Sequence, residues 1–86
     1  MTARLNLHHV DPARNMARFY ALQVQPSLFG EWVLVREWGR IGHAGTVKAP
    51  PYPTQSEAEE ALARLQSQKV RRGYLVDCHQ IYNTSN

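Results

Sequence analysis

Cysteine is nearly absent from this chain, and so are segments that would direct it into or across a membrane. The 86 residues include one cysteine, Cys78, which excludes an internal disulfide. The opening stretch "MTARLNLHHVD" has no apolar run of the length that a signal peptide or a membrane span requires. We therefore expect a protein of the reducing cytoplasm with no membrane association.

Acidic residues are also scarce, because seven Asp and Glu stand against ten Lys and Arg. The formal charge of +3 and the pI of about 9.4 permit a polyanionic partner such as a nucleic acid but do not require one. Repeats and low-complexity segments are missing, and 43% of the residues are hydrophobic, as in an ordinary globular domain. A chain of this length supports one core, so we expect a single domain over residues 1–86.

The residue spacings that mark catalytic or metal sites are missing too. His8 and His9 are adjacent and would point to opposite faces of a strand, while His43 lies in a predicted loop. His79 follows Cys78 directly, so the same alternation separates them, and we expect an inert thiol. No HxxxH, CxxC or paired-carboxylate spacing occurs. We expect no enzyme, no metal and no cofactor.

Alternation of apolar and polar residues predicts an antiparallel meander of about four strands. Turn-forming stretches, "DPARN", "PSLFG" and "GHAG", separate the predicted strands, which cover residues 4–10, 16–25, 31–39 and 46–49. The next segment, "APPYP", lacks an amide donor at three of its five positions. We therefore expect the sheet to stop there.

A single helix follows the prolines. Thr54 and Glu57 form a capping box, Ser56 and Glu59 form another, and Gly73 can terminate the helix. Its narrow apolar stripe predicts packing on the sheet through Ala58, Ala61, Leu62 and Leu65. The fold class is therefore α+β, a small antiparallel sheet with one helix on one face. Residues 74–82 either add an edge strand or lie along the surface, and residues 83–86 should fray.

The third strand decides where a ligand could bind. Unbroken alternation puts Trp32, Trp38 and Arg40 on one face with Leu34 and Arg36, and the valines of this strand on the other. We expect the valines beneath the helix and the tryptophans on the uncovered face or at its rim. A tryptophan there can stack on a sugar or base, and Arg40 can hold a phosphate. Residue types alone leave a second interpretation open, in which Trp38 fills a gap under the helix and Arg40 reaches solvent.

Three stretches, "YALQVQ", "EWVLVREWGRIGHAGTVK" and "SEAEEALARLQSQKVRRGY", follow one another at spacings that resemble the WGR domain, over about residues 16–74. This family occurs in DNA-dependent poly(ADP-ribose) polymerases and as stand-alone bacterial proteins. The resemblance implies a small antiparallel sheet with one helix and nucleic-acid binding. In the polymerases the motif tryptophan packs against the sugar at a DNA strand end, and the arginine links DNA to neighbouring domains.

Those roles fall on Trp38 and Arg40 of this chain. Since no catalytic, zinc-finger or regulatory segment accompanies them here, Arg40 either contacts phosphate or only braces its loop. Gly39 between them would let the backbone approach a ligand closely or let the strand bend. Several phosphate contacts are needed for useful affinity in salt, and the further expected contacts are Arg36, Lys48, Arg18 and Lys69.

We predict a DNA-binding module that recognises strand ends or nicks without sequence specificity. A recognition helix is not expected, because one side of the helix faces the sheet and its opposite side begins with acidic residues that repel phosphate. The partner could be another nucleic acid. A protein–protein adaptor that uses the same aromatic and arginine patch is the alternative, and a homodimer is also open.

Overall fold

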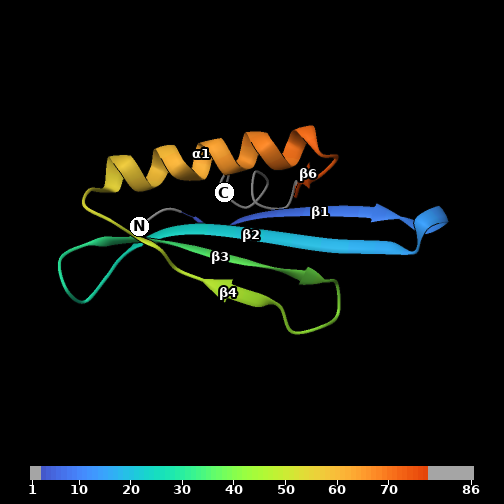
Figure 1. The fold of residues 1–86 in the computed structure, drawn as a ribbon, viewed down its shortest axis with the longest axis horizontal. Coiled ribbons are helices and arrows are strands. Elements are labelled where there is room, and N and C mark those ends of the chain that lie inside the picture. The colour runs from blue at the N-terminus through green and yellow to red at the C-terminus, as the bar shows by residue number, and fades with distance from the viewer. Residues whose placement is uncertain (1–2, 78–86) are drawn as a thin grey trace, which may run out of the picture.

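A computed structural model describes residues 3–77 of the protein, in which one helix lies along one face of an antiparallel sheet (Figure 1). The predicted α+β class is confirmed. Within these residues the sheet has the strand order β4-β3-β2-β1-β6, and β5 also pairs with β3. The elements are β1 (Leu5–Asp11), the 3-10 turn η1 (Pro12–Arg14), β2 (Met16–Pro26), β3 (Trp32–Arg40), β4 (Thr46–Lys48), β5 (Pro51–Tyr52), α1 (Gln55–Arg71) and β6 (Leu75–Val76).

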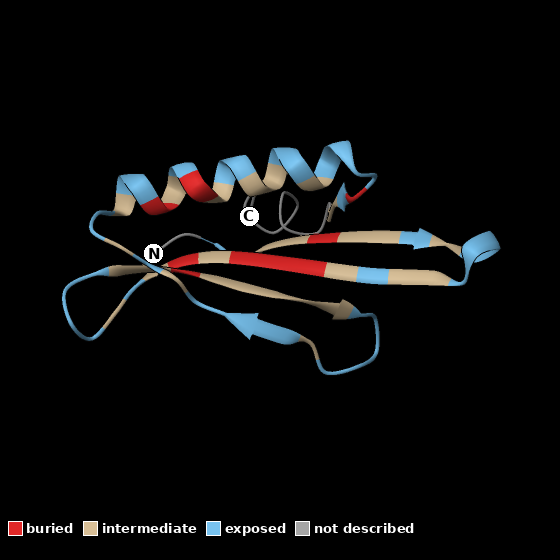
Figure 2. Cartoon of the chain, viewed as in Figure 1, coloured by how far each residue is buried: buried red, intermediate tan, exposed pale blue. Residues whose placement is uncertain are grey.

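The core lies between α1 and the middle of the sheet (Figure 2). Every second residue of β2 points to the helix, and Leu22 and Val24 are fully buried there. Ala58 and Ala61 face them from α1, and their small side chains let the helix approach the sheet closely. The core side chains are Leu7, Tyr20, Leu22, Val24, Leu34, Ala58, Ala61 and Tyr74.

The face predicted for the valines of β3 is wrong. Leu34 is fully buried in the helix-covered core, and Trp32 and Trp38 pack against the same core. Val33 and Val35 lie on the opposite face and are half-buried. The physical reason is the pairing with β2, whose most apolar residues oppose Leu34 and the tryptophans, so this face buries more apolar area than the valines could.

The expectation that the sheet stops at residues 49–53 is also wrong. Pro51 and Tyr52 pair with β3 opposite Val33 and Trp32. The Leu34 amide donates to the carbonyl oxygen of Pro50 at 3.1 Å. A proline lacks a donor but keeps its acceptor, and β5 lies at the edge of the sheet, where missing donors can be tolerated.

Both ends of α1 agree with the capping signals. The Glu57 amide donates to Thr54 Oγ1 at 3.1 Å, which caps the N-terminus. Gly73, with φ of +102°, ends the helix, and the Tyr74 amide turns back to the Lys69 carbonyl at 3.0 Å. For residues 74–82, β6 supports the edge strand over the first positions, while 78–82 and the predicted frayed tail 83–86 lie outside the described residues, as do Cys78 and His79.

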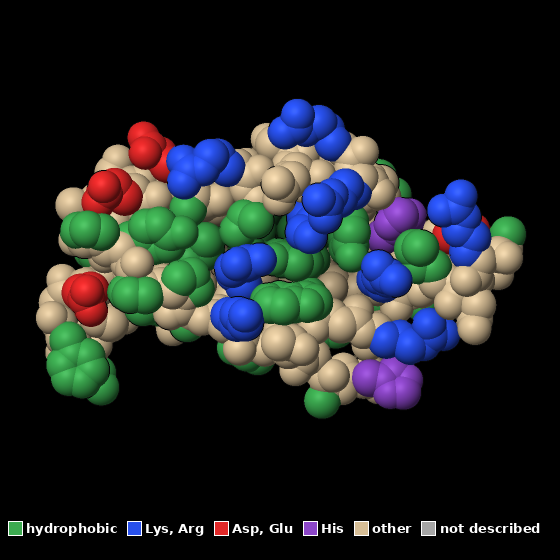
Figure 3. All heavy atoms as spheres, in the orientation of Figure 1, with side chains coloured by type: hydrophobic (Ala, Val, Ile, Leu, Met, Phe, Trp, Pro, Cys, Tyr) green, Lys and Arg blue, Asp and Glu red, His purple; other side chains and the backbone are tan. Residues whose placement is uncertain are grey.

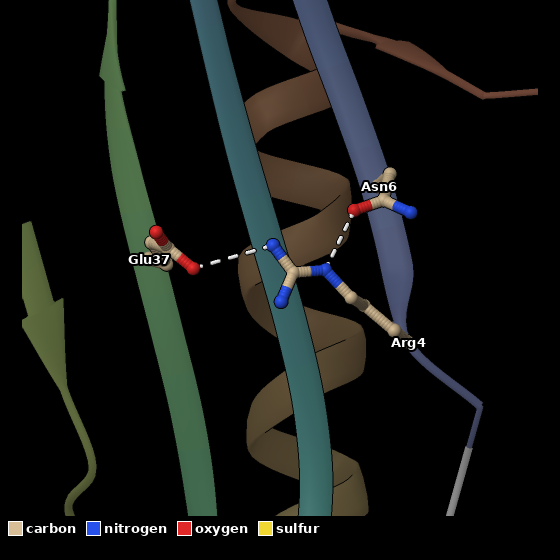
Figure 4. Close-up of polar contacts among 3 residues, drawn as sticks. All are labelled: Arg4, Asn6 and Glu37. Atoms are coloured by element: carbon tan, nitrogen blue, oxygen red, sulfur yellow. Dashed lines mark hydrogen bonds and ion pairs between the residues drawn. The ribbon is translucent and has the colours of Figure 1, made fainter. Parts of the chain in front are cut away.

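The second face of the sheet has one polar bridge across its middle. Arg4 donates to Asn6 Oδ1 at 2.9 Å and forms an ion pair with Glu37 at 3.3 Å, so its guanidinium crosses over β2 (Figure 4). Ala21 lies between Asn6 and Glu37 in the register and is buried. Arg4 therefore belongs to the face opposite α1.

The glycine of the Trp-Gly-Arg motif is needed for packing. A Cβ on Gly39 would lie 3.1 Å from the Cα of Gly45, and one on Gly45 would lie 2.7 Å from both the Phe19 ring and the Trp38 carbonyl oxygen. The loop after β3 can fold back against the strand only because both residues lack a side chain. The expected close approach is therefore real, but its partners are Phe19 and the loop itself.

Gly45→Ala should destabilise the fold, because the clash with the Trp38 carbonyl involves backbone that cannot rotate away. We expect a loss of about 1–3 kcal/mol, and each kcal/mol lowers the Tm of a domain of this size by about 4–8 °C. Thermal unfolding followed by circular dichroism measures it. Ala44→Ser, at the exposed neighbouring position, is the control; an unchanged Tm for Gly45→Ala would contradict this packing.

Candidate nucleic-acid interface

A hollow of about 620 Å³ opens on the helix-covered face, between α1 and the strands β2 and β3. We call it the basic hollow. Its lining joins four cations and three aromatic residues: Arg18, Tyr20, Arg36, Trp38, Gly39, Arg40, Lys69 and Tyr74. Six of the seven residues expected to bind nucleic acid from the sequence therefore meet in one place.

An aromatic row forms the floor of the hollow. Tyr20 and Trp38 are directly opposite in the β2–β3 register, and their rings stack with centroids 5.6 Å apart and planes 12° apart. Tyr74 meets Tyr20 edge to face at 6.3 Å, and His9 meets Tyr74 at 5.3 Å. Trp38 is half-buried and packs against the helix-covered core. It does not lie on the uncovered face or at its rim, and its position agrees with the second interpretation, in which it packs under the helix.

Arg36 is fixed over this floor. Its Nε and Nη2 donate to the hydroxyl oxygen of Tyr20 at 3.0 and 2.7 Å. Its guanidinium carbon lies 5.3 Å from the Trp38 ring centroid and 5.9 Å from that of Tyr20. These contacts hold the charge in one orientation before any ligand arrives.

Lys69 reaches the floor from the last turn of α1. Its Nζ lies 4.5 Å from the Tyr20 ring centroid and 5.8 Å from that of Tyr74. Burial lowers the pKa of Lys69 below its usual 10.5, and the positive charges of Arg72 and Arg36 lower it further. The aromatic faces attract this ammonium, while the neighbouring cations repel it, so the hollow already carries crowded positive charge.

Arg40 braces a turn. Its Nη1 donates to the Asn15 carbonyl oxygen at 3.2 Å and its Nη2 to Asn15 Oδ1 at 3.4 Å. Asn15 has φ of +52°, a left-handed conformation that ends η1. These two bonds are the contacts that the bracing role requires.

The remaining predicted cations differ in position. Arg18 is exposed, opposes Arg40 in the register and lines the hollow. Within residues 3–77 its side chain makes no hydrogen bond or ion pair. Lys48 is exposed on β4 opposite Arg36, next to the hollow but outside its lining.

Charge is unevenly distributed along the molecule. Figure 3 shows Lys and Arg side chains over the centre and right of this face, whereas most of the Asp and Glu in view lie at the left, where Figure 1 shows the start of α1 and the β2–β3 loop. Most of the cationic side chains in view therefore lie away from the acidic ones, and this distribution favours an anion at the basic hollow over the acidic end.

Two lining residues were missed from the sequence. Tyr20 alternates with Leu22 and Val24, a pattern typical of a core face. Tyr74, just after the helix, can contact either a base or the edge of the core, and the sequence favours the core. Both are indeed buried, yet both line the hollow. The signal that could have found Tyr20 is the strand register, because it places Tyr20 beside Trp38.

Among residues 3–77, no helix is both long and apolar enough to cross a bilayer. No group of three or more His, Cys, Asp and Glu side chains in this range is arranged to hold a metal ion.

Arg72→Gln should raise the pKa of Lys69 toward 10.5, because it removes one of the two repelling charges. The side-chain carbon signals of Lys69 in an NMR pH titration measure this pKa. Arg71→Gln is the matched control, because Arg71 is not among the charges that lower the pKa of Lys69. This variant should leave that pKa unchanged. A downward or absent shift in Arg72→Gln would contradict the charge crowding.

The lowered pKa of Lys69 also determines whether the free energy of unfolding rises or falls with pH. Between the folded-state pKa of Lys69 and 10.5 the unfolded chain binds more protons than the folded one, so this lysine makes the free energy of unfolding rise with pH in that window. Lys69→Gln should remove that rise, which urea unfolding at several pH values would measure. An identical pH slope in the variant would contradict the assignment.

Comparison with known proteins agrees with the motif. The chain matches the family described as the WGR domain over residues 3–80, which extends the resemblance seen at 16–74 to include β1. An uncharacterised protein of Sinorhizobium fredii (strain NBRC 101917 / NGR234), designated y4dW, is 42% identical over 71 residues, 83% of this chain and 35% of the relative. The chain thus spans about a third of that relative, and no solved structure matches it. The chain belongs to the WGR domain family, which is associated with nucleic-acid binding.

Proposed function

We propose that this domain binds DNA at strand ends or nicks, without sequence specificity, through the basic hollow. The observation that carries the proposal is the convergence of Trp38, Tyr20 and Tyr74 with four cations in one open concavity. Trp38, the half-buried ring of the three, offers a stacking surface to a sugar or base, and arginine and lysine neutralise phosphates.

Stacking gives the preference for strand termini. In an intact duplex each base is covered on both sides by its neighbours, whereas an end or a nick leaves a base or sugar face uncovered. Trp38 has one ring face against Tyr20 and is half-buried, so it presents a fixed surface and not a flexible one. Such a contact contributes about 1–3 kcal/mol.

Phosphate binding relieves the charge crowding of the hollow. Arg36 commits Nε and Nη2 to the Tyr20 hydroxyl, which leaves Nη1 for a phosphate oxygen. That hydroxyl accepts both bonds on its oxygen, so its own proton can be donated to the same anion. Arg18 and Lys69 supply further charge, and Lys48 lies at the periphery. Arg40 contributes mainly by fixing the turn at Asn15.

Sequence specificity is not expected from this surface. The apolar side of α1 is committed to the core, and its first turns carry the acidic residues Glu57, Glu59 and Glu60. Among residues 3–77, α1 therefore offers no recognition helix to the basic hollow, and phosphate and stacking contacts carry no sequence information.

Binding to labelled nicked, blunt and hairpin-closed duplexes should weaken steeply with salt. With about four phosphate contacts, affinity should fall about 100-fold between 50 and 200 mM salt, as measured by fluorescence anisotropy. The nicked and blunt duplexes should bind more tightly than the closed one. Equal binding to all three would contradict end recognition, and a salt-independent affinity, or no binding, would favour the protein–protein adaptor instead.

Trp38→Leu should weaken binding to nicked duplex by about 10- to 100-fold, since leucine keeps apolar bulk but removes the stacking surface. Trp32→Leu is the matched control, because Trp32 lies on the same face of β3 and packs on the core but does not line the hollow. Circular dichroism verifies both folds. Equal losses in the two variants would contradict a contact through Trp38.

Arg18→Gln should lower the salt slope by about one phosphate contact. Arg4→Gln removes the same charge from the opposite face of the sheet and should leave the slope unchanged. A slope that falls equally in both variants would mean that net charge, and not the basic hollow, drives binding.

A further inference from the structure

The loop between β2 and β3 carries two large apolar side chains in solvent. Leu28 is 98% exposed and Phe29 is 86% exposed. Isolated exposed apolar residues are common, but two adjacent ones of this size at the tip of a hairpin form a contiguous apolar surface. We call residues 27–30 the hairpin tip.

The hairpin tip is held in one conformation. The Ser27 amide donates to the Glu31 carbonyl at 2.8 Å, and the Phe29 amide donates to Ser27 Oγ at 3.1 Å. Gly30 closes the turn with φ of +84°. Because the loop is ordered by its own hydrogen bonds, docking of its side chains costs little further backbone entropy.

The end of the molecule that carries the hairpin tip is acidic. Glu31 adjoins it and is exposed, and Glu57 and Glu60 at the start of α1 are exposed too. In Figure 3 apolar side chains protrude at the lower left, where Figure 1 shows the β2–β3 loop, and most of the acidic side chains in view are at the same end. Negative charge disfavours contact with phosphate, in DNA or in an anionic bilayer. A partner surface for this tip should be apolar or aromatic with a cationic rim.

The basic hollow of the same protein has that chemistry. Its floor is Trp38, Tyr20 and Tyr74, and its rim is Arg18, Arg36, Arg40 and Lys69. The tip cannot reach its own hollow, since Trp32 and Trp38 alone are separated by about 20 Å along one strand. A second copy has no such restriction.

We propose that the hairpin tip of one copy docks into the basic hollow of a second copy, head to tail. Phe29 then packs against Trp38, the half-buried ring of the aromatic floor, and Glu31 approaches the cationic rim. Such an interface is heterologous, so each copy keeps one unused tip and one unused hollow, and association continues into open chains unless it closes into a ring. Two side chains and a few charges make a small contact, so the association is weak.

Self-association and DNA binding then use the same surface. This part rests on the proposed function: a copy whose hollow holds a neighbour's tip cannot place that hollow on DNA. The association itself is independent of DNA and is tested without it.

Sedimentation velocity from 10 µM to 1 mM at low salt tests the association. The weight-average mass of the wild type should rise above the 9.8 kDa monomer with concentration. Phe29→Ser combined with Leu28→Ser should remain monomeric, whereas Leu75→Ser, which removes another exposed leucine, should behave as the wild type. Both tip positions are exposed, so the fold should persist, as circular dichroism would verify.

Mixing two variants tests the head-to-tail geometry. The tip variant keeps an intact hollow, and Arg18→Glu keeps an intact tip but reverses a charge on the rim of the hollow. Each should be monomeric alone at 1 mM. Their equimolar mixture should form a dimer and nothing larger, because only one productive tip and one productive hollow are present.

Four results would overturn the proposal: a wild type that is monomeric at 1 mM, association that the tip variant leaves unchanged, a mixture that stays monomeric, or a mixture that forms larger species. Titration of the tip variant with nicked duplex, and with vesicles containing anionic lipid, covers the other partners. Weaker binding than the wild type at 1 µM protein, where chains are dissociated, would assign the tip to DNA or to a membrane and also overturn it. Failure to bind DNA at all would remove the proposed function and leave the self-association result standing.

Discussion

The stack of Tyr20 on Trp38 across β2 and β3 determines the rest of this site. It sits where the core ends, so each ring is supported by packing and also lines the basic hollow. The Tyr20 hydroxyl accepts hydrogen bonds that orient Arg36, and the face of the Tyr20 ring contacts the ammonium of Lys69. Removing the Tyr20 ring would release both cations, so stability and ligand binding share the same contacts at this point.

The Trp-Gly-Arg motif divides these tasks among its three residues. Trp38 supplies the aromatic surface, Gly39 permits the close return of the loop at Gly45, and Arg40 holds the turn at Asn15. Two of the three thus shape the backbone around the hollow, and the charges nearest the aromatic floor come from outside the motif. A short motif can therefore mark a site whose binding energy depends on residues of other elements.

Local chemistry predicted the elements well, because turns and caps depend on neighbouring residues. The Thr54 cap and the end of α1 at Gly73 follow from such signals. The face of β3 did not follow, since both alternating sets of that strand contain apolar residues and only pairing with β2 decides between them. Pairing of Pro51 with β3 did not follow either, because the prolines lack amide donors but the carbonyl oxygen of Pro50 still accepts a bond from β3. The hydrogen bond from Arg40 to Asn15 joins residues 25 positions apart in the sequence. The pattern of neighbouring residues does not predict a contact over such a separation.

Trp38 and Trp32 give two indole N–H signals on one strand, one within the hollow and one outside its lining. Two-dimensional ¹H–¹⁵N NMR during titration with a nicked duplex therefore tests most directly whether the basic hollow receives DNA. The account predicts that the Trp38 indole and the amides of Arg18, Gly39 and Tyr74 shift while the Trp32 indole stays in place. Shifts gathered around Arg4 and Glu37 on the opposite face, with the Trp38 indole unmoved, would contradict it.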